Sequence, residues 1–330
     1  MDRNLALELV RVTETAALAS AAFMGRGDKN GADGAAVEGM RKAFESVNVK
    51  GEVVIGEGEL DEAPMLYIGE KVGCGEIEVD IAVDPLDGTS LIAKSLPNAI
   101  AVIAMGAKNS LLKAPDTYME KIMVGPKGKG LIDIDDSVTN NITRVAKAMN
   151  KRLKDMTIIV QDRKRHDDIV KEARDLGVRI KFFDVGDIAA GLATCFNDSD
   201  VDMLFGIGGG PEGVIAAAAL KCMGGDMQAR IHPLSEEEYQ RCYEMNFTKE
   251  EISKKLTLED LAKGEELFFA ATGVTSGEFL KGVTYKGEDM MQTQSVVMRN
   301  KTKTVRFVDA IHRLDKNDII EELMEKYKDL

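Results

Sequence analysis

Apolar side chains recur at helical spacing near the start of the chain. They occupy every third or fourth position through residues 3–24, and Gly25 follows as a helix stop. The same spacing returns over residues 34–47, directly after Asp33, whose side chain is of a type that caps helix starts. The pattern therefore predicts two successive helices.

Short apolar runs predict strands in the rest of the first half. The expected strands are 52–55, 77–83, 99–105 and 130–134. Within the second of these, apolar and polar residues alternate, which places Asp80 and Asp84 on the face opposite the aliphatic side chains. The first half therefore has an α+β pattern.

Strands and helices alternate from residue 156, as expected for βαβ units around a mostly parallel sheet. The expected elements are strands 156–160, 178–183 and 201–205 and helices 166–176, 187–196 and 212–223. Residues 235–266 are polar and favour surface helices, and 268–310 returns to a strand-like pattern. The change of pattern predicts two domains, residues 1–150 and residues 151–330.

Composition and charge narrow the classes of function. The 330 residues are 44% hydrophobic and 30% charged, which is typical of a globular protein long enough for two domains. The formal net charge of -13 disfavours nucleic-acid binding, because phosphate backbones are bound by surfaces rich in Lys and Arg. No apolar run approaches the roughly 20 residues that cross a bilayer. We expect neither a nucleic-acid partner nor a membrane.

The four cysteines indicate a reducing compartment. Cys74, Cys195, Cys222 and Cys242 are scattered without CxxC spacing, so neither a zinc knuckle nor a disulfide framework is indicated. The N-terminus lacks the apolar core and cleavage site of a signal peptide. We expect free thiols and a cytoplasmic location.

The segment DIAVDPLDGTS, residues 80–90, carries the clearest chemical pattern. A strand ends at Asp84 and Pro85 forces a turn, so that Asp84 and Asp87 are held close together. Such carboxylates repel each other in a partly desolvated site unless a cation lies between them, and oxygen ligands suit Mg²⁺ or Mn²⁺. Thr89 would begin a short helix whose free N–H groups receive a phosphate. A turn capped by an Asp side chain is the alternative.

Two further acids lie in glycine-rich segments. Glu57 follows the strand EVVI within GEGE, and flanking glycines let a backbone and a metal approach closely. Glu212 follows three glycines and Pro211 at a helix start, where the helix dipole favours its charge. Taken alone, Glu57 could equally stand at a charged hairpin tip, and Glu212 and Asp33 could be helix caps.

The string DPLDGT resembles the signature of the lithium-sensitive, metal-dependent phosphatase superfamily. Three longer strings are similar to the class II fructose-1,6-bisphosphatases, and together they extend the resemblance over nearly the whole chain. They are RGDKNGADGAA at 26–36, GEGELDEAPMLYIGEKVG at 56–73 and GIGGGPEG at 206–213. The resemblance implies an α/β protein with the layered α/β/α/β/α sugar-phosphatase fold, two domains, and an active site between them.

The resemblance also implies a set of metal ligands and a catalytic group. By motif, the metal-binding acids are Asp33, Glu57, Asp84, Asp87 and Glu212, and the cofactor is Mg²⁺ or Mn²⁺. Thr89 would orient and deprotonate the attacking water, with Asp33 and Glu57 as its carboxylate partners. Position 87 departs from some relatives, which carry Glu there.

A basic triplet offers a clamp for a second phosphate. Arg163, Lys164 and Arg165 follow the strand MTIIV, at the edge where α/β sheets bind ligands, and a guanidinium matches phosphate oxygens. A solvated loop is the alternative, and His166 beside it is a candidate phosphate contact. The family places substrate contacts at this triplet and at Asp87, Gly88, Thr89, Tyr118, Val185, Gly186, Asp187 and Gly209. Val185 replaces an Asp of some relatives.

The expected function is hydrolysis of fructose 1,6-bisphosphate to fructose 6-phosphate and phosphate, in gluconeogenesis or growth on glycerol. The resemblance also implies a homo-oligomer, a dimer or a tetramer. One alternative is another phosphatase of the superfamily, acting on inositol monophosphate or sedoheptulose 1,7-bisphosphate; the basic triplet disfavours a monophosphate substrate. A second is a catalytically silent phosphosugar-binding regulator, which the five acids and Thr89 disfavour.

Overall fold

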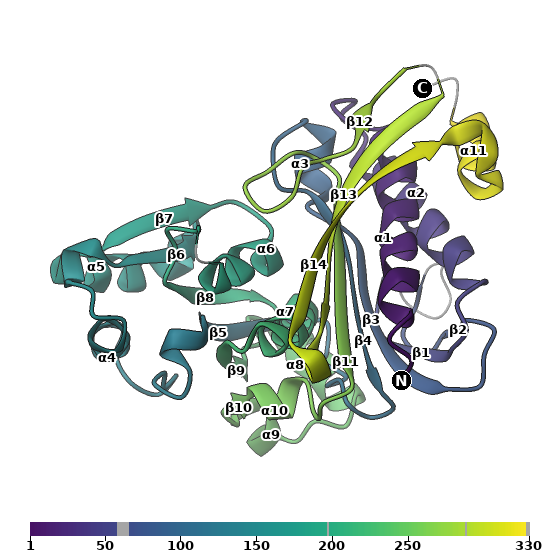
Figure 1. Ribbon diagram of the computed structural model, residues 1–330. Helices are drawn as coiled ribbons and strands as arrows, with labels where there is room; N and C mark the ends of the chain where they lie inside the picture. The colour runs from purple at the N-terminus through teal and green to yellow at the C-terminus, as the bar shows by residue number, and fades with distance from the viewer. Residues whose placement is uncertain (58–65, 197, 288, 328–330) are drawn as a thin grey trace. The chain divides into compact units, whose positions relative to one another are not determined.

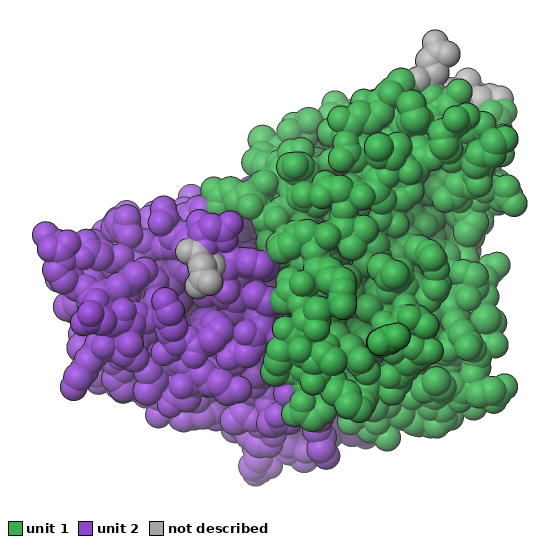
Figure 2. Space-filling model, in the orientation of Figure 1, with its two compact units in different colours: residues 1–111, 265–330 green, residues 112–264 purple. Residues whose placement is uncertain are grey.

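The computed structural model describes residues 1–57, 66–196, 198–287 and 289–327. Contacts divide the chain into two compact units, unit 1 (Met1–Leu111 and Glu265–Leu330) and unit 2 (Leu112–Gly264) (Figure 2). Part of the glycine-rich string at 56–73, namely 58–65, lies outside the described residues. No described helix is long and apolar enough to pass through a membrane.

Unit 1 begins with two helices that pack on each other, α1 (Leu5–Ala21) and α2 (Lys29–Phe44) (Figure 1). The second helix starts five residues before the predicted position, because the Asp28 side chain accepts a hydrogen bond from the Gly31 N–H and caps it. Asp33 therefore lies inside α2 and is not its cap.

One mixed sheet forms the core of unit 1. Its strands are β1 (Lys50–Ile55), β2 (Lys71–Val72), β3 (Glu78–Asp87), β4 (Ile100–Ala107), β11 (Leu267–Gly273), β12 (Thr284–Tyr285), β13 (Met290–Arg299) and β14 (Thr304–Arg313). They run in the order β12-β13-β11-β4-β3-β1-β2, with β14 paired to β13. Among the described strands of this sheet, only β1 and β3 pair in parallel. Helix α1 packs against β4, β11 and β13, and the unit also contains α3 (Thr89–Ala93) and α11 (Asp318–Lys326).

The return of the chain to this sheet explains why the units differ from the predicted domains. The sequence pattern put a boundary between residues 150 and 151, whereas the chain leaves unit 1 after Leu111 and returns at Glu265. It returns because β11 pairs with β4 over its whole length, from Leu267 opposite Gly106 to Gly273 opposite Ile100.

Unit 2 contains a second mixed sheet. Its strands are β5 (Tyr118–Val124), β6 (Thr157–Gln161), β7 (Arg179–Phe183), β8 (Met203–Gly209), β9 (Asp226–Ile231) and β10 (Leu256–Thr257), in the order β10-β9-β5-β8-β6-β7. The pairs β6–β7 and β6–β8 are parallel, as predicted. The prediction of a mostly parallel sheet was wrong beyond them, because β5 inserts antiparallel between β8 and β9.

The helices of unit 2 cover the two faces of its sheet. They are α4 (Val138–Ala148), α5 (Asp167–Leu176), α6 (Asp187–Leu192), α7 (Gly210–Met223), α8 (Glu236–Glu244), α9 (Lys249–Ser253) and α10 (Leu258–Leu261). Short 3₁₀ turns are η1 (Pro126–Gly128), η2 (Leu153–Asp155), η3 (Lys164–His166) and η4 (Ala193–Cys195), with η5 (Asn300–Thr302) and η6 (Leu314–Lys316) in unit 1. Helix α5 packs on α4, and α6 packs on α7.

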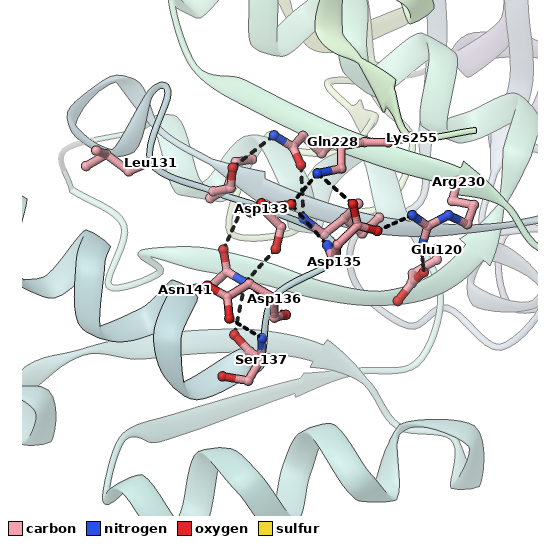
Figure 3. Close-up of polar contacts among 12 residues, drawn as sticks. Glu120, Leu131, Asp133, Asp135, Asp136, Ser137, Asn141, Gln228, Arg230 and Lys255 are labelled. Carbon is pink, nitrogen blue, oxygen red and sulfur yellow. Dashed lines mark hydrogen bonds and ion pairs between the residues drawn. The ribbon is translucent and has the colours of Figure 1, made fainter. Parts of the chain in front are cut away.

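The predicted strand at 130–134 is wrong, because side chains rather than a neighbouring strand satisfy its backbone. Ile132 and Ile134 are buried in the core of unit 2, which produces the strand-like alternation. The Ile134 N–H donates to the Gln228 side chain (2.9 Å), and that side chain donates to the Ile132 carbonyl (2.9 Å). Figure 3 shows the surrounding acids paired with Lys255 and Arg230.

Candidate active site

Two of the predicted metal-binding acids lie just beyond the last residue pair that joins β1 to β3. In this parallel pair Ile55 lies opposite Ala82. Glu57 and Asp84 each lie two residues beyond that pair, so the register brings both to the same edge of the unit 1 sheet. Both carboxylates are half-buried.

A bulge carries the third acid to the same edge. Between the pairs Asp84–Val102 and Asp87–Ile100, strand β3 contains one residue more than β4. The turn is fixed by the Asp84 carboxylate, which accepts a hydrogen bond from the Leu86 N–H (3.0 Å). Asp87 is buried. Asp84 and Asp87 thus lie three positions apart at one strand end, on either side of the bulge.

Thr89 is the first residue of α3, directly after this bulge. Gly88 before it has φ +99°, a left-handed conformation that side chains rarely adopt. A side chain at Gly88 would also lie 2.9 Å from the Leu91 side chain. Glycine here lets the chain turn from strand to helix and places Thr89 two residues from Asp87.

Asp33 joins this side of unit 1 through α2, which packs against β3 and α3. Its carboxyl group is partly buried, and this burial raises its pKa above the ordinary value. A raised pKa means that the ionised form lacks the solvation it would have in water. A bound cation would reverse the effect, so the environment of Asp33 fits a cation ligand.

The four acids of unit 1 and Glu212 of unit 2 are all oxygen donors, which fits a hard divalent cation. Within the described residues, however, no three Asp, Glu, His or Cys side chains converge closely enough to hold a metal ion. The convergence of the five acids in one metal site therefore stays a prediction.

In unit 2 the basic triplet follows the carboxyl end of β6 and Gly209 ends β8, while Val185, Gly186 and Asp187 follow β7 and Tyr118 begins β5. The connections from the neighbouring strands β6 and β8 leave in opposite directions, β6 to β7 and β8 to β9. Right-handed crossovers then place α5 and α7 on opposite faces of the sheet. The space outside such strand ends is where open α/β sheets bind ligands. The basic triplet and the glycine loop both reach it.

Arg165 is held firmly at this edge. Its Nε donates to the Ile207 carbonyl (2.9 Å) and its Nη2 to the Gln161 side chain (2.6 Å). The guanidinium carbon lies 4.8 Å from the centre of the Tyr118 ring, a cation–π contact. Two predicted substrate residues, Arg165 and Tyr118, are thus brought together.

The other two basic residues are placed differently. Arg163 is bound to Asp184, through its Nη1 to the carboxylate (2.7 Å) and its Nη2 to the backbone carbonyl (2.9 Å). Lys164 is exposed at the start of η3. The expectation that His166 contacts phosphate is wrong, because its ring is completely buried and both nitrogens bond to the backbone.

A buried lysine that the sequence analysis did not identify joins two of the predicted positions. Lys121 in β5 is 1% exposed, and its Nζ donates to the Asp187 carboxylate (2.5 Å) and the Gly209 carbonyl (2.8 Å). Its signal in the sequence is a single cation inside the apolar strand YMEKIMV. Asp187 begins α6 after Gly186, which has φ +100°, and Val185 before them is half-buried.

Glu212 lies in the first turn of α7, as predicted. Its Oε2 atom is buried and has no hydrogen-bond partner among the described residues. Burial, and next the charge of Asp187, raise the pKa of Glu212, while the Lys121 ammonium lowers it. A buried carboxylate oxygen without a donor is a suitable ligand for a cation.

The glycines before α7 make room for these carboxylates. A side chain at Gly208 would lie 1.9 Å from Asp187 Oδ2, and one at Gly209 would lie 1.7 Å from Glu212 Oε2. Glycine at these two positions therefore leaves the space that the Asp187 and Glu212 carboxylates occupy.

Comparison with known proteins connects this arrangement to a family. The family model described as bacterial fructose-1,6-bisphosphatase, glpX-encoded, matches residues 3–312. The fructose-1,6-bisphosphatase class 2 of Haemophilus influenzae is 47% identical over 329 residues, which cover 96% of this chain and 98% of the relative. The fructose-1,6-bisphosphatase 1 class 2 of Escherichia coli K12 is 46% identical over 332 residues, with the same coverage.

Proposed function

This chain belongs to the glpX-encoded bacterial fructose-1,6-bisphosphatases, and we propose that it hydrolyses the 1-phosphate of fructose 1,6-bisphosphate to give fructose 6-phosphate and phosphate. The observation that carries the proposal is the carboxylate edge of unit 1, where Glu57 follows β1 and Asp84 and Asp87 lie in the last residues of β3. Water is the second reactant, and its oxygen ends in the released phosphate.

The family is metal-dependent, and we assign Mg²⁺ or Mn²⁺ to this chain because its candidate ligands are all carboxylates. The residues that would hold the cations are Asp33, Glu57, Asp84, Asp87 and Glu212. When bound, such cations neutralise the phosphate and lower the pKa of a water molecule.

Thr89 is the proposed catalytic hydroxyl. It is placed by the bulge of β3 and the left-handed Gly88, so that it follows Asp87 by two residues. We assign to it the orientation and deprotonation of the attacking water, with Asp33 and Glu57 as carboxylate partners.

The distal phosphate of the substrate is assigned to unit 2. Arg165 is set in place by Gln161, Ile207 and Tyr118, so a phosphate that binds it need not order a mobile side chain. The other proposed contacts with the substrate are Arg163, Lys164, Val185, Gly186, Asp187 and Gly209 in unit 2, with Asp87, Gly88 and Thr89 in unit 1.

Two alternatives are kept because they predict different results. A monophosphatase for inositol phosphate would gain nothing from the fixed Arg165, and sedoheptulose 1,7-bisphosphate would use it equally well. A silent phosphosugar-binding regulator would bind the sugar without releasing phosphate.

The test is phosphate release by the purified protein from these sugars and from inositol monophosphate, with Mg²⁺ or Mn²⁺. We expect turnover of fructose 1,6-bisphosphate, and its loss with a chelator. Binding without phosphate release would favour the regulator, and a preference for the monophosphate would overturn the bisphosphatase proposal.

We also propose a cellular location, an oligomeric state and a metabolic role for the protein. All four cysteines are free thiols, which supports a reducing cytoplasm. We further propose a homo-oligomer, a dimer or a tetramer, and a role in gluconeogenesis or growth on glycerol.

A further inference from the structure

The strands β6 and β8 separate at the edge where the distal phosphate is proposed to bind. Within the described residues their ladder consists of two pairs, Ile158 with Met203 and Ile159 with Leu204. Each strand continues beyond the ladder, β6 to Gln161 and β8 to Gly209. Backbone groups facing this gap need partners other than the opposite strand.

The imidazole of His166 fills the gap. Its Nδ1 lies 2.8 Å from the Gln161 carbonyl oxygen, and the Ile207 N–H donates to its Nε2 at 2.8 Å. The residue is completely buried. A side chain added at Gly206 would lie 3.3 Å from Nε2, so glycine leaves room for the ring.

The two partners fix the protonation of the ring. A backbone N–H can only donate, so Nε2 must accept from Ile207 and carries no proton. A carbonyl can only accept, so Nδ1 must carry the proton that is donated to Gln161. Burial, and the charge of Arg165, lower the pKa of His166, while the hydrogen bond to the Gln161 carbonyl and the charge of Asp187 act in the opposite direction. The ring is therefore the neutral Nδ1–H tautomer.

His166 and Arg165 are bound to the same two residues. Arg165 donates to the Gln161 side chain and to the Ile207 carbonyl, while His166 binds the Gln161 carbonyl and the Ile207 N–H. A separation of the strand ends would therefore move the two groups that hold the Arg165 guanidinium away from each other. The buried histidine therefore helps to determine the position of the partly buried Arg165 guanidinium.

We propose that His166, as its neutral Nδ1–H tautomer, is a positioning residue that sets the Arg165 guanidinium in place for the distal phosphate of the substrate. The inference rests on the proposed bisphosphatase function. It assigns to His166 no contact with substrate and no step in proton transfer.

The first test separates the two hydrogen bonds of the ring. His166→Asn keeps a donor near the Nδ1 position but does not reach Ile207, whereas His166→Gln reaches Ile207 with an acceptor. We expect His166→Asn to raise KM for fructose 1,6-bisphosphate by about 10-fold with kcat within about twofold, because one buried hydrogen bond changes binding on this scale. His166→Gln should restore KM toward wild type.

Inhibition by fructose 6-phosphate, which carries the distal phosphate alone, gives a second reading. Its inhibition constant should rise in His166→Asn by about the same factor as KM. His312→Asn is the matched control, because His312 is another histidine with a side-chain hydrogen bond, to Thr293 (2.8 Å), in unit 1. That control should leave both constants unchanged.

The decisive comparison uses Arg165→Ala. If His166 acts through Arg165, then Arg165→Ala/His166→Asn should raise KM no more than Arg165→Ala alone. Additive effects, or a loss of kcat and thermal stability without a change in KM, would overturn the inference. A wild-type protein that does not hydrolyse the bisphosphate would refute the proposed function instead.

A spectroscopic measurement tests the tautomer independently of activity. The chain has three histidines, so nitrogen-15 spectra of the labelled protein can be assigned by the signal that disappears in His166→Asn. We expect the shifts of a neutral ring protonated at Nδ1. A ring protonated at Nε2, or a cationic ring at neutral pH, contradicts the geometry on which the inference is built.

Discussion

At the scale of single residues, Gly209 offers a direct test of the Glu212 position. A methyl group there would overlap Glu212 Oε2, which is the far end of a flexible side chain and can be pushed aside. We therefore expect Gly209→Ala to fold, with a melting temperature near that of wild type, and to lose at least about 10²-fold in kcat/KM, the scale of a displaced functional group.

Gly34 provides the matched control. It lies in α2, and a side chain there would meet nothing within 4 Å. Gly34→Ala should keep its activity and gain up to about 1 kcal/mol in helix stability. Equal activity of Gly209→Ala and wild type in a phosphate-release assay would show that the position of Glu212 is not needed.

Lys121 leads to a second prediction at this scale. Removing one partner of a buried ion pair leaves an uncompensated charge, which costs about 3–5 kcal/mol. We expect Lys121→Met to lower the free energy of unfolding by an amount of this order. Lys121→Met/Asp187→Asn should recover a large part, because no charge is then stranded. Denaturant titration of the three proteins measures both effects, and no recovery in the double variant would contradict the pairing.

The sequence identified the acids but not the residues that position them. Asp84, Asp87 and Glu212 stand in local motifs, where a strand end or helix start can be read from neighbouring residues. The contact of Lys121 with Asp187 spans 66 positions, and that of His166 with Ile207 spans 41. Which residues meet in such contacts depends on the order of the strands in the sheet, and the local pattern of apolar residues does not reveal that order.

At the scale of elements, α1 and the strand pair β13–β14 share a buried acid. Glu14 in α1 accepts a hydrogen bond from Thr293 in β13 (3.3 Å) and lies 3.9 Å from His312 in β14. Burial raises the pKa of Glu14 to about 7, although the Thr293 bond and the Arg11 charge act in the opposite direction.

The sign of the pH effect follows from this shift. A raised folded-state pKa favours the protonated form, so its stabilisation is complete below the unfolded value of 4.5 and is lost as the pH rises to about 7. The loss is about 3 kcal/mol at most. Burial lowers the pKa of His312, whose contribution is instead lost as the pH falls.

Glu14→Gln isolates the contribution of Glu14. We expect the variant to be more stable than wild type at pH 8, and to differ little from it at pH 4.5, where wild-type Glu14 is protonated. Melting temperatures of both proteins across this range measure the difference, and the shared titration of His312 cancels. A difference that does not change with pH would contradict the shift.

Periodicity predicted most elements but not how they pair. The strands at β1, β3, β6 and β7 and the helices α5 and α7 were found where the apolar pattern placed them. All of these except β7 contain buried residues. The loop at 130–134 shows the limit of that signal. Its isoleucines are buried like those of a strand, but the bonds from Gln228, 94 and 96 residues away, were not visible in the sequence.

At the scale of the whole molecule, the segments that form unit 1 are not contiguous in the sequence. Unit 1 is made from both ends of the chain, since β11 to β14 extend the sheet begun by β1 to β4. The order of predicted strands and helices along the sequence changes near residue 150, and that position lies within unit 2. Pairing between distant strands is what assigns the C-terminal fifth of the chain to the first sheet.

Because the proposed metal ligand Asp84 lies in unit 1 and the proposed phosphate clamp Arg165 lies in unit 2, we expect substitutions in the two units to change different kinetic constants. Asp84→Asn removes a proposed metal charge in unit 1, so turnover should fall below about 1% of wild type while the fold is kept. Without metal its stability should equal or exceed that of wild type, because repulsion between the acids is relieved. Wild-type turnover in this variant would refute the metal assignment.

Arg165→Ala should produce the complementary effect from unit 2. A charge-assisted hydrogen bond contributes roughly 1.5–3 kcal/mol, so kcat/KM for fructose 1,6-bisphosphate should fall by about 10- to 100-fold, mainly through KM. Inhibition by fructose 6-phosphate should weaken in parallel, and a monophosphate without the distal group should be affected little.

Arg163→Ala is the control that the structure supplies for this prediction. Both arginines belong to the basic triplet, but Arg163 is already paired with Asp184, whereas Arg165 is held by neutral groups and keeps its charge uncompensated by any of those partners. A phosphate should therefore gain more from Arg165, and Arg163→Ala should raise KM by a smaller factor. If the two variants lose binding equally for substrates with and without the distal phosphate, the triplet acts as a general basic surface and does not select a bisphosphate.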